Sequence, residues 1–183
     1  FYSPCFHLAV DNFSINFLNS NINPIIKLGD NFNTNYNFIT GSNPKDWFTG
    51  IKAAKELTLE EVFKGIDLRL YSDENGSMEF DWIIKPGADY RDIQMNFEGQ
   101  DKLKIDKNGN IKVKLRFTEV GFNIPESYQV TPLGKKKVDF KFTETGHNLV
   151  SFKTDSEIDA QYPLIIDPTL VWGTYMDGDI TGN

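Results

Sequence analysis

The sequence predicts an all-β protein, an antiparallel β-sandwich-like domain with short helical turns. Aromatic residues make up 14% of the 183 residues, and 15 residues are Phe, a composition that favours strands. Two Asn-Gly dipeptides each lie between runs of alternating apolar and polar residues, which is the signal of a β-hairpin. Such runs recur roughly every eight to twelve residues, a spacing typical of a sandwich or barrel.

The two hairpins have the same pattern, in which apolar residues alternate with charged ones on both sides of an Asn-Gly turn. The period of two gives each hairpin one apolar and one charged face. We therefore expect both hairpins to protrude or to lie at a sheet edge. They are 66–70 with 78–84 around Asn75-Gly76, and 103–105 with 111–117 around Asn108-Gly109.

The remaining strands are expected where short apolar runs lie between turn residues. Helix is scarce: Asn43–Trp47 has the pattern of one capped turn with Pro44 at its first position, and Thr58–Glu61 that of a capping-box turn. The expected strands are 93–98, 120–124, 128–131, 138–142, 149–153, 164–167 and 170–175.

An unusual alternation of asparagine with aromatic residues begins at Asn31. The pattern favours an edge strand or a loop whose amides face water over an asparagine ladder that binds sugar. The asparagines are Asn31, Asn33, Asn35 and Asn37, and they alternate with Phe32, Thr34, Tyr36 and Phe38.

We expect one all-β domain over 1–175, because the composition does not break along that stretch. The segment 176–183 is polar and rich in glycine, so it is interpreted as a linker or the start of a following repeat domain. The chain opens abruptly inside a strand-like run, which favours a truncated N-terminus.

Charge and cysteine content exclude several classes. The net charge of −7 repels nucleic acid and anionic lipid, so nucleic-acid binding is not expected. The single cysteine, Cys5, leaves no internal disulfide. No run approaches the roughly 18 apolar residues that span a bilayer, so membrane insertion is not expected.

The residues that could carry catalysis do not combine into a known pattern, so no enzyme is predicted and no catalytic or cofactor-binding residue is assigned. His7 and His147 have neither a nucleophile nor a zinc-ligand spacing around them. Glu79 and Asp81 could form a glycosidase-like acid pair. They alternate with apolar residues, however, which places them on the solvent side of a strand.

Calcium is a weak possibility at two acidic clusters, because clustered oxygen ligands suit a hard cation. The turn Asp106–Asn110 is explained by its hairpin. Asp177 and Asp179, separated by a glycine, are the weak calcium candidates. The lysine run 135–137 is interpreted as protection of a hairpin tip or sheet edge, with a positive patch for an acidic polysaccharide as the alternative.

Four phrases follow one another along the chain: 36–47 (YNFITGSNPKDW), 63–71 (FKGIDLRLY), 78–89 (MEFDWIIKPGAD) and 162–170 (YPLIIDPTL). In this order they resemble an uncharacterised N-terminal domain that precedes SBBP-type β-propeller repeats in large secreted or cell-surface bacterial proteins. The family is common in Bacteroidetes-type bacteria with type IX secretion. The resemblance implies a gliding- or adhesin-like role and no defined catalytic residue. This chain departs from the family's usual sequence at 173–178, where the propeller would start.

Two functions follow as expectations. The first is a non-catalytic structural or adhesive module, extracellular or on the cell surface, that packs on or spaces a following β-propeller or repeat array. Its partners would be the following domain of the same chain, and surface polysaccharide or other cell-surface proteins. The alternative is a carbohydrate-binding module of a secreted glycan-degrading enzyme, with Trp47, Tyr90 or Trp172 as weak ligand-binding candidates. Exposed coplanar rings would favour the alternative, and buried rings the first function.

Overall fold

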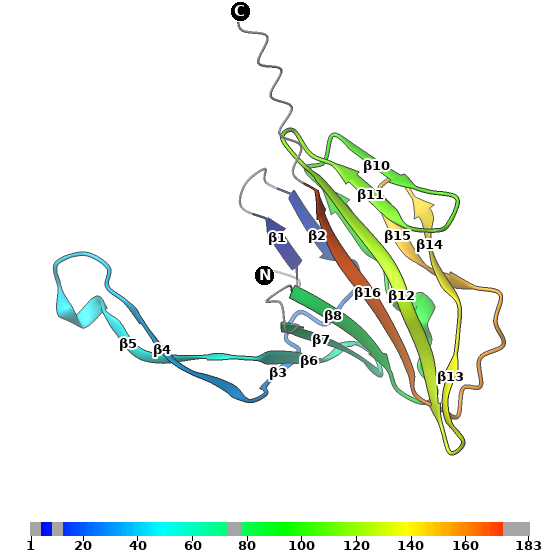
Figure 1. Ribbon diagram of the computed structural model, residues 1–183, viewed down its shortest axis with the longest axis horizontal. Coiled ribbons are helices and arrows are strands. Elements are labelled where there is room, and N and C mark those ends of the chain that lie inside the picture. The colour runs from blue at the N-terminus through cyan, green and yellow to red at the C-terminus, as the bar shows by residue number, and fades with distance from the viewer. Residues whose placement is uncertain (1–4, 9–12, 73–77, 174–183) are drawn as a thin grey trace, which may run out of the picture.

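The computed structural model describes the backbone of residues 5–8, 13–72 and 78–173, and the side chains of 13–72, 79–124 and 126–170. The structure is 62% strand and 4% helix, with antiparallel sheets and only short 3-10 turns. The all-β prediction is therefore confirmed. Figure 1 shows two larger sheets that form a body and a long ribbon that projects away from it.

The smaller sheet of the body has five antiparallel strands in the order β1-β2-β9-β15-β14. Its central strand, β9, lies between β2 and β15. Its strands come from both ends of the chain. The strands are β1 (Cys5–Leu8), β2 (Phe13–Phe17), β9 (Met95–Glu98), β15 (Leu149–Thr154) and β14 (Phe140–Gly146).

The larger sheet has nine strands in the order β10-β11-β12-β16-β8-β7-β6-β3, with β13 paired to the far end of β12. The long strands β12 and β16 pair along almost their whole lengths. The strands are β10 (Lys102–Ile105), β11 (Ile111–Lys114), β12 (Glu119–Thr131), β16 (Leu164–Gly173), β8 (Met78–Ile84), β7 (Ile66–Ser72), β6 (Glu56–Phe63), β3 (Ile25–Leu28) and β13 (Gly134–Lys137).

The third sheet is a two-stranded ribbon of β4 (Asn31–Phe38) and β5 (Phe48–Ala54). Its far end carries the 3-10 turn η1 (Pro44–Asp46), and the side chain of Asn43 accepts a hydrogen bond from Lys45 N at its start. The capped turn predicted at Asn43–Trp47 is confirmed. A second turn, η2 (Tyr90–Asp92), lies before β9.

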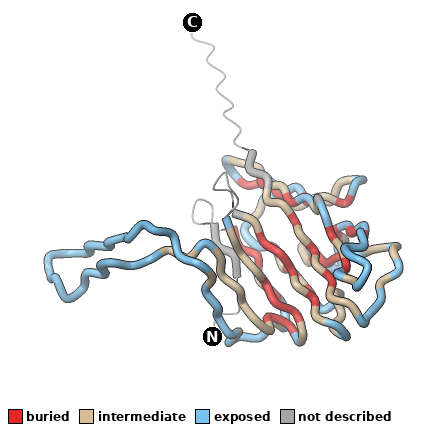
Figure 2. Tube along the Cα trace, turned by 60° about the horizontal axis from the view of Figure 1, so that its bottom comes forward, coloured by how far each residue is buried: buried red, intermediate tan, exposed pale blue. Residues whose placement is uncertain are grey.

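The core lies between the two larger sheets, where buried apolar residues of both sheets face one another. Ring contacts join the layers: Phe17 of β2 meets Trp82 of β8 edge to face at 5.1 Å between ring centroids, and Phe97 of β9 meets Phe122 of β12 at 5.9 Å. In Figure 2 the buried residues are confined to this body, and the ribbon is almost wholly exposed. The core is thus complete without the ribbon.

Two prolines interrupt the sequence pattern without interrupting the strands. The register between β12 and β16 shifts between Asn123 and Glu126, at Pro125. Pro168 of β16 lies at the same shift, between the partners of Asn123 and Glu126. Proline cannot donate to a strand ladder and is tolerated at a bulge. The four short strands expected around these prolines are therefore two long ones.

Three local expectations were wrong. The hairpin of β7 and β8 lies inside the nine-stranded sheet rather than at its edge, whereas β10 and β11 do form an edge. The capping-box turn expected at Thr58–Glu61 is part of strand β6. Asp81 is 2% exposed, so it does not face solvent; β16, far along the chain, pairs with β8 and places Asp167 next to it.

Candidate functional site

The ribbon of β4 and β5 is the clearest candidate for a binding surface. Paired residues of antiparallel strands lie on the same face, so Tyr36 opposite Ile51 and Phe38 opposite Phe48 define one apolar face. All four side chains are exposed, and Phe48 is 63% exposed. Asn35, which pairs with Lys52, directly precedes Tyr36 and so lies on the opposite, polar face. An apolar face left open to water marks a binding surface.

The tip of the ribbon is held by hydrogen bonds within the turn. Trp47 Nε1 donates to Gly41 O at 3.3 Å, and Thr40 Oγ1 donates to the carbonyl of Asp46 at 2.9 Å. Gly50 N donates to Asn37 Oδ1 at 2.8 Å, where Gly50 has a positive φ of 69°. The tip therefore presents Trp47, which is 36% exposed, in a defined position.

The root of the ribbon is continuous with the hairpin of β3 and β6. Lys55 N donates to Asp30 O at 2.7 Å, and Gly29 N donates to Glu56 O at 3.0 Å. A Cβ on Gly29 would lie 2.2 Å from the Glu56 side chain, so this position needs glycine. The ribbon is thus an extension of the sheet.

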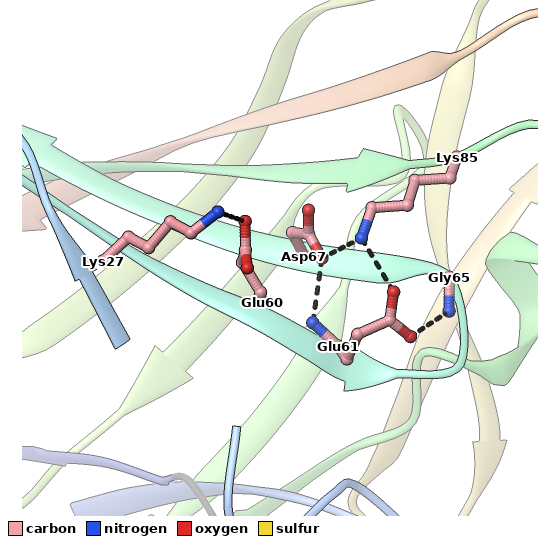
Figure 3. A network of polar contacts seen from close by, with 6 residues as sticks. All are labelled: Lys27, Glu60, Glu61, Gly65, Asp67 and Lys85. Atoms are coloured by element: carbon pink, nitrogen blue, oxygen red, sulfur yellow. Dashed lines mark hydrogen bonds and ion pairs between the residues drawn. The ribbon is translucent and has the colours of Figure 1, made fainter. Parts of the chain in front are cut away.

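A polar network supports the turn between β6 and β7 (Figure 3). Lys85 Nζ contacts Glu61 Oε1 at 2.7 Å and Asp67 Oδ1 at 2.9 Å, and Glu61 Oε2 accepts from Gly65 N at 2.8 Å. The hydrogen bonds that Glu61 accepts from Lys85 and Gly65 lower the pKa of Glu61. The hydrogen bonds that Lys85 donates to Glu61 and Asp67 raise the pKa of Lys85. The network supplies hydrogen-bond partners at an irregularity in β6, where the register shifts and Glu61 has a positive φ of 56°.

A cleft of about 770 Å³ opens beside this bulge. Its lining combines the loop 18–21 with Phe63, Lys64, Arg91 and Gln94. Arg91 is paired with Asp89 through Nε and Oδ1 at 2.8 Å. Two of the four charged residues along the cleft, Glu61 and Arg91, are therefore engaged in local ion pairs, Glu61 with Lys85 and Arg91 with Asp89.

Two carboxyl groups lie side by side on the outer face of the nine-stranded sheet. Asp81 of β8 accepts from Arg69 Nε at 3.0 Å and from the Tyr71 hydroxyl at 3.3 Å. Burial, together with the neighbouring Asp81, raises the pKa of Asp167 to about 6. The Arg69 guanidinium also lies over the Tyr71 ring, at 4.8 Å. Burial also raises the pKa of the Tyr71 hydroxyl.

The ligand candidates from the sequence do not come together. Trp47 lies at the ribbon tip, whereas Tyr90 lies in η2, where its ring packs edge to face on Phe140 at 5.0 Å. The backbone of Trp172 belongs to β16, and its side chain lies outside the described set. Asp177 and Asp179 also lie outside the described residues.

The structure accounts for the other acidic and basic clusters. Asp106 Oδ1 accepts from Asn108 N at 2.8 Å and Asn110 N at 3.0 Å, so its carboxylate closes its own turn. Within the described residues, no group of three or more His, Cys, Asp and Glu is placed to hold a metal ion. The lysines 135–137 lie on β13, paired with the end of β12, as expected for a hairpin edge.

The sequence missed the apolar face of the ribbon and the pair of Asp81 with Asp167. The alternation from Asn31 indicated a strand with exposed amides, and this expectation is confirmed. The alternation could not indicate that the aromatic face of the strand is exposed as well, because burial of that face depends on elements that lie far away in the sequence.

The fold and site define a class: a β-sandwich of two antiparallel sheets with one exposed amphipathic ribbon. A family described as a domain of unknown function (DUF7948) matches residues 4–169, and the chain belongs to this family. Searches of curated proteins and of solved structures returned no match. In the part of the chain that is described, no helix is long and apolar enough to cross a membrane.

Proposed function

We propose that this chain is a non-catalytic structural or adhesive module of a large exported cell-surface protein, and that the ribbon is its contact element. The observation that carries the proposal is the apolar face of the ribbon, where Tyr36, Phe38, Phe48 and Ile51 are exposed. Side chains of this kind release free energy when a partner covers them. The partners are a following domain of the same chain, such as a β-propeller or repeat array, and other cell-surface proteins or polysaccharide.

The burial of Asp81 and its hydrogen bonds support a non-catalytic role. Asp81 is 2% exposed, and Arg69 and Tyr71 occupy its oxygens. A glycosidase acid must reach the substrate oxygen, with its partner carboxylate across the substrate. Asp81 is covered by its own neighbours, so the pair of Asp81 and Asp167 acts as an internal contact of the sheet.

The four sequence phrases resemble domains that precede SBBP-type propellers, and this resemblance supports a position ahead of a propeller or repeat array in a larger protein. A domain ahead of a long array needs a stable body and a surface for its neighbour. The body meets the first requirement through its core, and the projecting ribbon meets the second (Figure 1). On the basis of this resemblance we propose that the protein lies outside the cell or on its surface.

One observation favours the carbohydrate-binding alternative. The Trp47 ring is partly exposed and is fixed by its hydrogen bond to Gly41 O, and aromatic rings of this kind can stack on a ligand. Tyr90, in contrast, packs on Phe140. Titration of the chain with glycans would favour the alternative if binding occurs and Trp47→Ala abolishes it.

The proposal is tested with a ribbon-trimmed variant, in which Asn-Gly replaces residues 30–55 between Gly29 and Glu56. These two residues are hydrogen-bonded at 3.0 Å, and Asn-Gly closes a two-residue hairpin. The natural protein with this change is expressed in its own cells, with Leu133→Ser, at a fully exposed position, as the control. We expect normal export but lost cell attachment for the trimmed protein only. Attachment equal to that of the unaltered protein would contradict the proposal.

A further inference from the structure

We propose that the outer face of the hairpin formed by β10 and β11 binds the carboxylates of an acidic polysaccharide. The surface consists of four lysines, which we call the lysine face: Lys102, Lys104, Lys112 and Lys114. β10 lies at one edge of the nine-stranded sheet, and β3, which leads into the ribbon, lies at the other edge (Figure 1). The lysine face is therefore a second surface, and the inference goes beyond the contact role proposed for the ribbon.

The register of the hairpin places the lysines directly opposite one another. Lys102 pairs with Lys114, and Lys104 pairs with Lys112. The apolar residues that alternate with them belong to the core or pack against it, whereas all four lysines are exposed. Opposite Cβ atoms lie roughly 5 Å apart, and alternate residues along a strand lie about 7 Å apart. The four side chains thus leave the sheet from one small patch of its outer face.

This arrangement is unfavourable in the free chain, because like charges directly opposite each other destabilise a sheet. Among the described residues, none of the four lysines forms an ion pair. On β12, the next strand, Glu119 lies opposite Lys114, and Gly121 lies opposite Lys112. One carboxylate therefore faces the four cations across the strands. A bound polyanion would offset the repulsion between the lysines.

Protection of the sheet edge explains only part of this pattern. Proteins place lysine on edge strands to prevent pairing with another strand, and β10 is such a strand. β11 is not an edge strand, because it lies between β10 and β12. It nevertheless supplies Lys112 and Lys114 to the same face. These two lysines have no role in guarding the edge, which leaves them for a ligand.

A second pair of opposed lysines shows how such charges are balanced elsewhere in the fold. Lys141 of β14 and Lys153 of β15 are directly opposite each other in the five-stranded sheet, and both are exposed. The cleft beside them is also lined by Asp106, Asp139 and Asp155. These acids supply negative charge next to the pair. The lysine face has twice as many lysines and a single acid opposite them, so it is the surface that an external anion would occupy.

Charge favours an acidic polysaccharide over nucleic acid as the ligand. The segment 101–117 contains six basic and two acidic residues, so the remainder of the chain has a net charge of −11, against −7 for the whole. This remainder repels a polyanion as densely charged as nucleic acid. The outward residues of β10 and β11 are all lysine, without an aromatic ring on which a base could stack. An acidic polysaccharide carries carboxylates along a neutral sugar backbone and needs no such ring.

The first test is calorimetric titration of the purified chain with polygalacturonate at low and at moderate salt. Fully methyl-esterified polygalacturonate, which has the same sugars without the charges, is the control ligand. We expect binding of the charged polymer only, and an affinity that falls as salt is raised, because salt screens exposed charges. Absence of binding at low salt, or equal binding of the esterified polymer, would overturn the inference.

The second test locates the site on the hairpin. Lys112→Gln together with Lys114→Gln should weaken polygalacturonate binding by about fivefold or more, because two exposed ion pairs are lost. The matched control, Lys141→Gln together with Lys153→Gln, removes the same charge and should change the affinity less than about twofold, because distant charges are screened. The lysine-face variant should unfold at the same or a higher urea concentration, because repulsion is reduced.

Three results would contradict the assignment. Equal weakening by the two pairs of substitutions would indicate a diffuse attraction without a site. Binding that is lost in the ribbon-trimmed variant but kept in the lysine-face variant would move the site to the ribbon. Tighter binding of a single-stranded oligonucleotide than of polygalacturonate would assign the lysine face to nucleic acid. Cell attachment of the ribbon-trimmed protein tests the proposed function separately, because the ribbon lies at the other edge of the sheet.

Discussion

At the scale of single residues, Asp167 makes the stability of the fold depend on pH. Its pKa is raised to about 6 by burial and by Asp81, against an ordinary value near 3.8. Between these values the folded chain holds a proton that the unfolded chain has lost. The free energy of unfolding therefore falls as pH rises through this window.

We expect Asp167→Asn to be more stable than the unaltered chain at pH 8, with the difference shrinking towards pH 4. Urea unfolding at several pH values measures this. Asp89→Asn is the matched control, because its hydrogen bonds with Arg91 lower the pKa of Asp89. Its loss should destabilise the fold at neutral pH, and that effect should fade in acid. A constant difference for Asp167→Asn across the range would refute the assignment.

Two lysines on neighbouring parts of the sheet should differ in their contribution to stability (Figure 3). Lys85 pairs with Asp67, whose side chain is only 10% exposed. Lys27 pairs with Glu60 nearer the surface, and the Lys27 side chain is 64% exposed. Removing Lys85 leaves a buried carboxylate without its cation. We expect Lys85→Met to lower the free energy of unfolding by about 1–3 kcal/mol, and Lys27→Met by less than about 1 kcal/mol. Equal losses in denaturant titrations would contradict the larger contribution of Lys85.

At the scale of elements, residue patterns predicted which segments form strands, but they did not predict which strands pair with one another in the sheets. Period-two alternation located β7, β8, β10 and β11, because it reflects burial of one face. The same alternation placed Asp81 in solvent. It could not reveal that β16, which begins at Leu164, pairs with β8. The prolines led to a different error, because they predicted strand ends at Pro125 and Pro168. Both residues lie at one shared register shift inside the long strands β12 and β16.

The ribbon is an element that the core does not need. Every residue from Asn31 to Lys52 is exposed, so its removal takes no apolar side chain from the sandwich. We expect the ribbon-trimmed variant to change the free energy of unfolding by less than about 1 kcal/mol. Thermal and urea unfolding measure this. A variant that unfolds or loses several degrees of melting temperature would show that the ribbon supports the body.

At the scale of the whole molecule, composition predicted a sandwich, and facing aromatic residues such as Phe17 and Trp82 form its core. The candidate site was less accessible to sequence reasoning. Trp47 was singled out as a possible ligand residue, and it does lie at the ribbon tip, 36% exposed. The exposed apolar face of the ribbon beside Trp47 was not predicted, because an alternating sequence does not indicate whether another layer of the protein packs on the apolar face.

The most direct measurement of the central claim is the rate of trypsin cleavage after Lys45 and Lys52, compared between the purified chain and the natural protein on intact cells. Cleavage of a marginal hairpin follows its local opening. Lys135–137 of β13, also exposed, provide the reference sites, and they should be cut at similar rates in all samples. If the ribbon is a contact element, Lys45 and Lys52 are protected on cells relative to the purified chain. Equal cleavage at these two lysines on cells and in the purified chain would contradict the account.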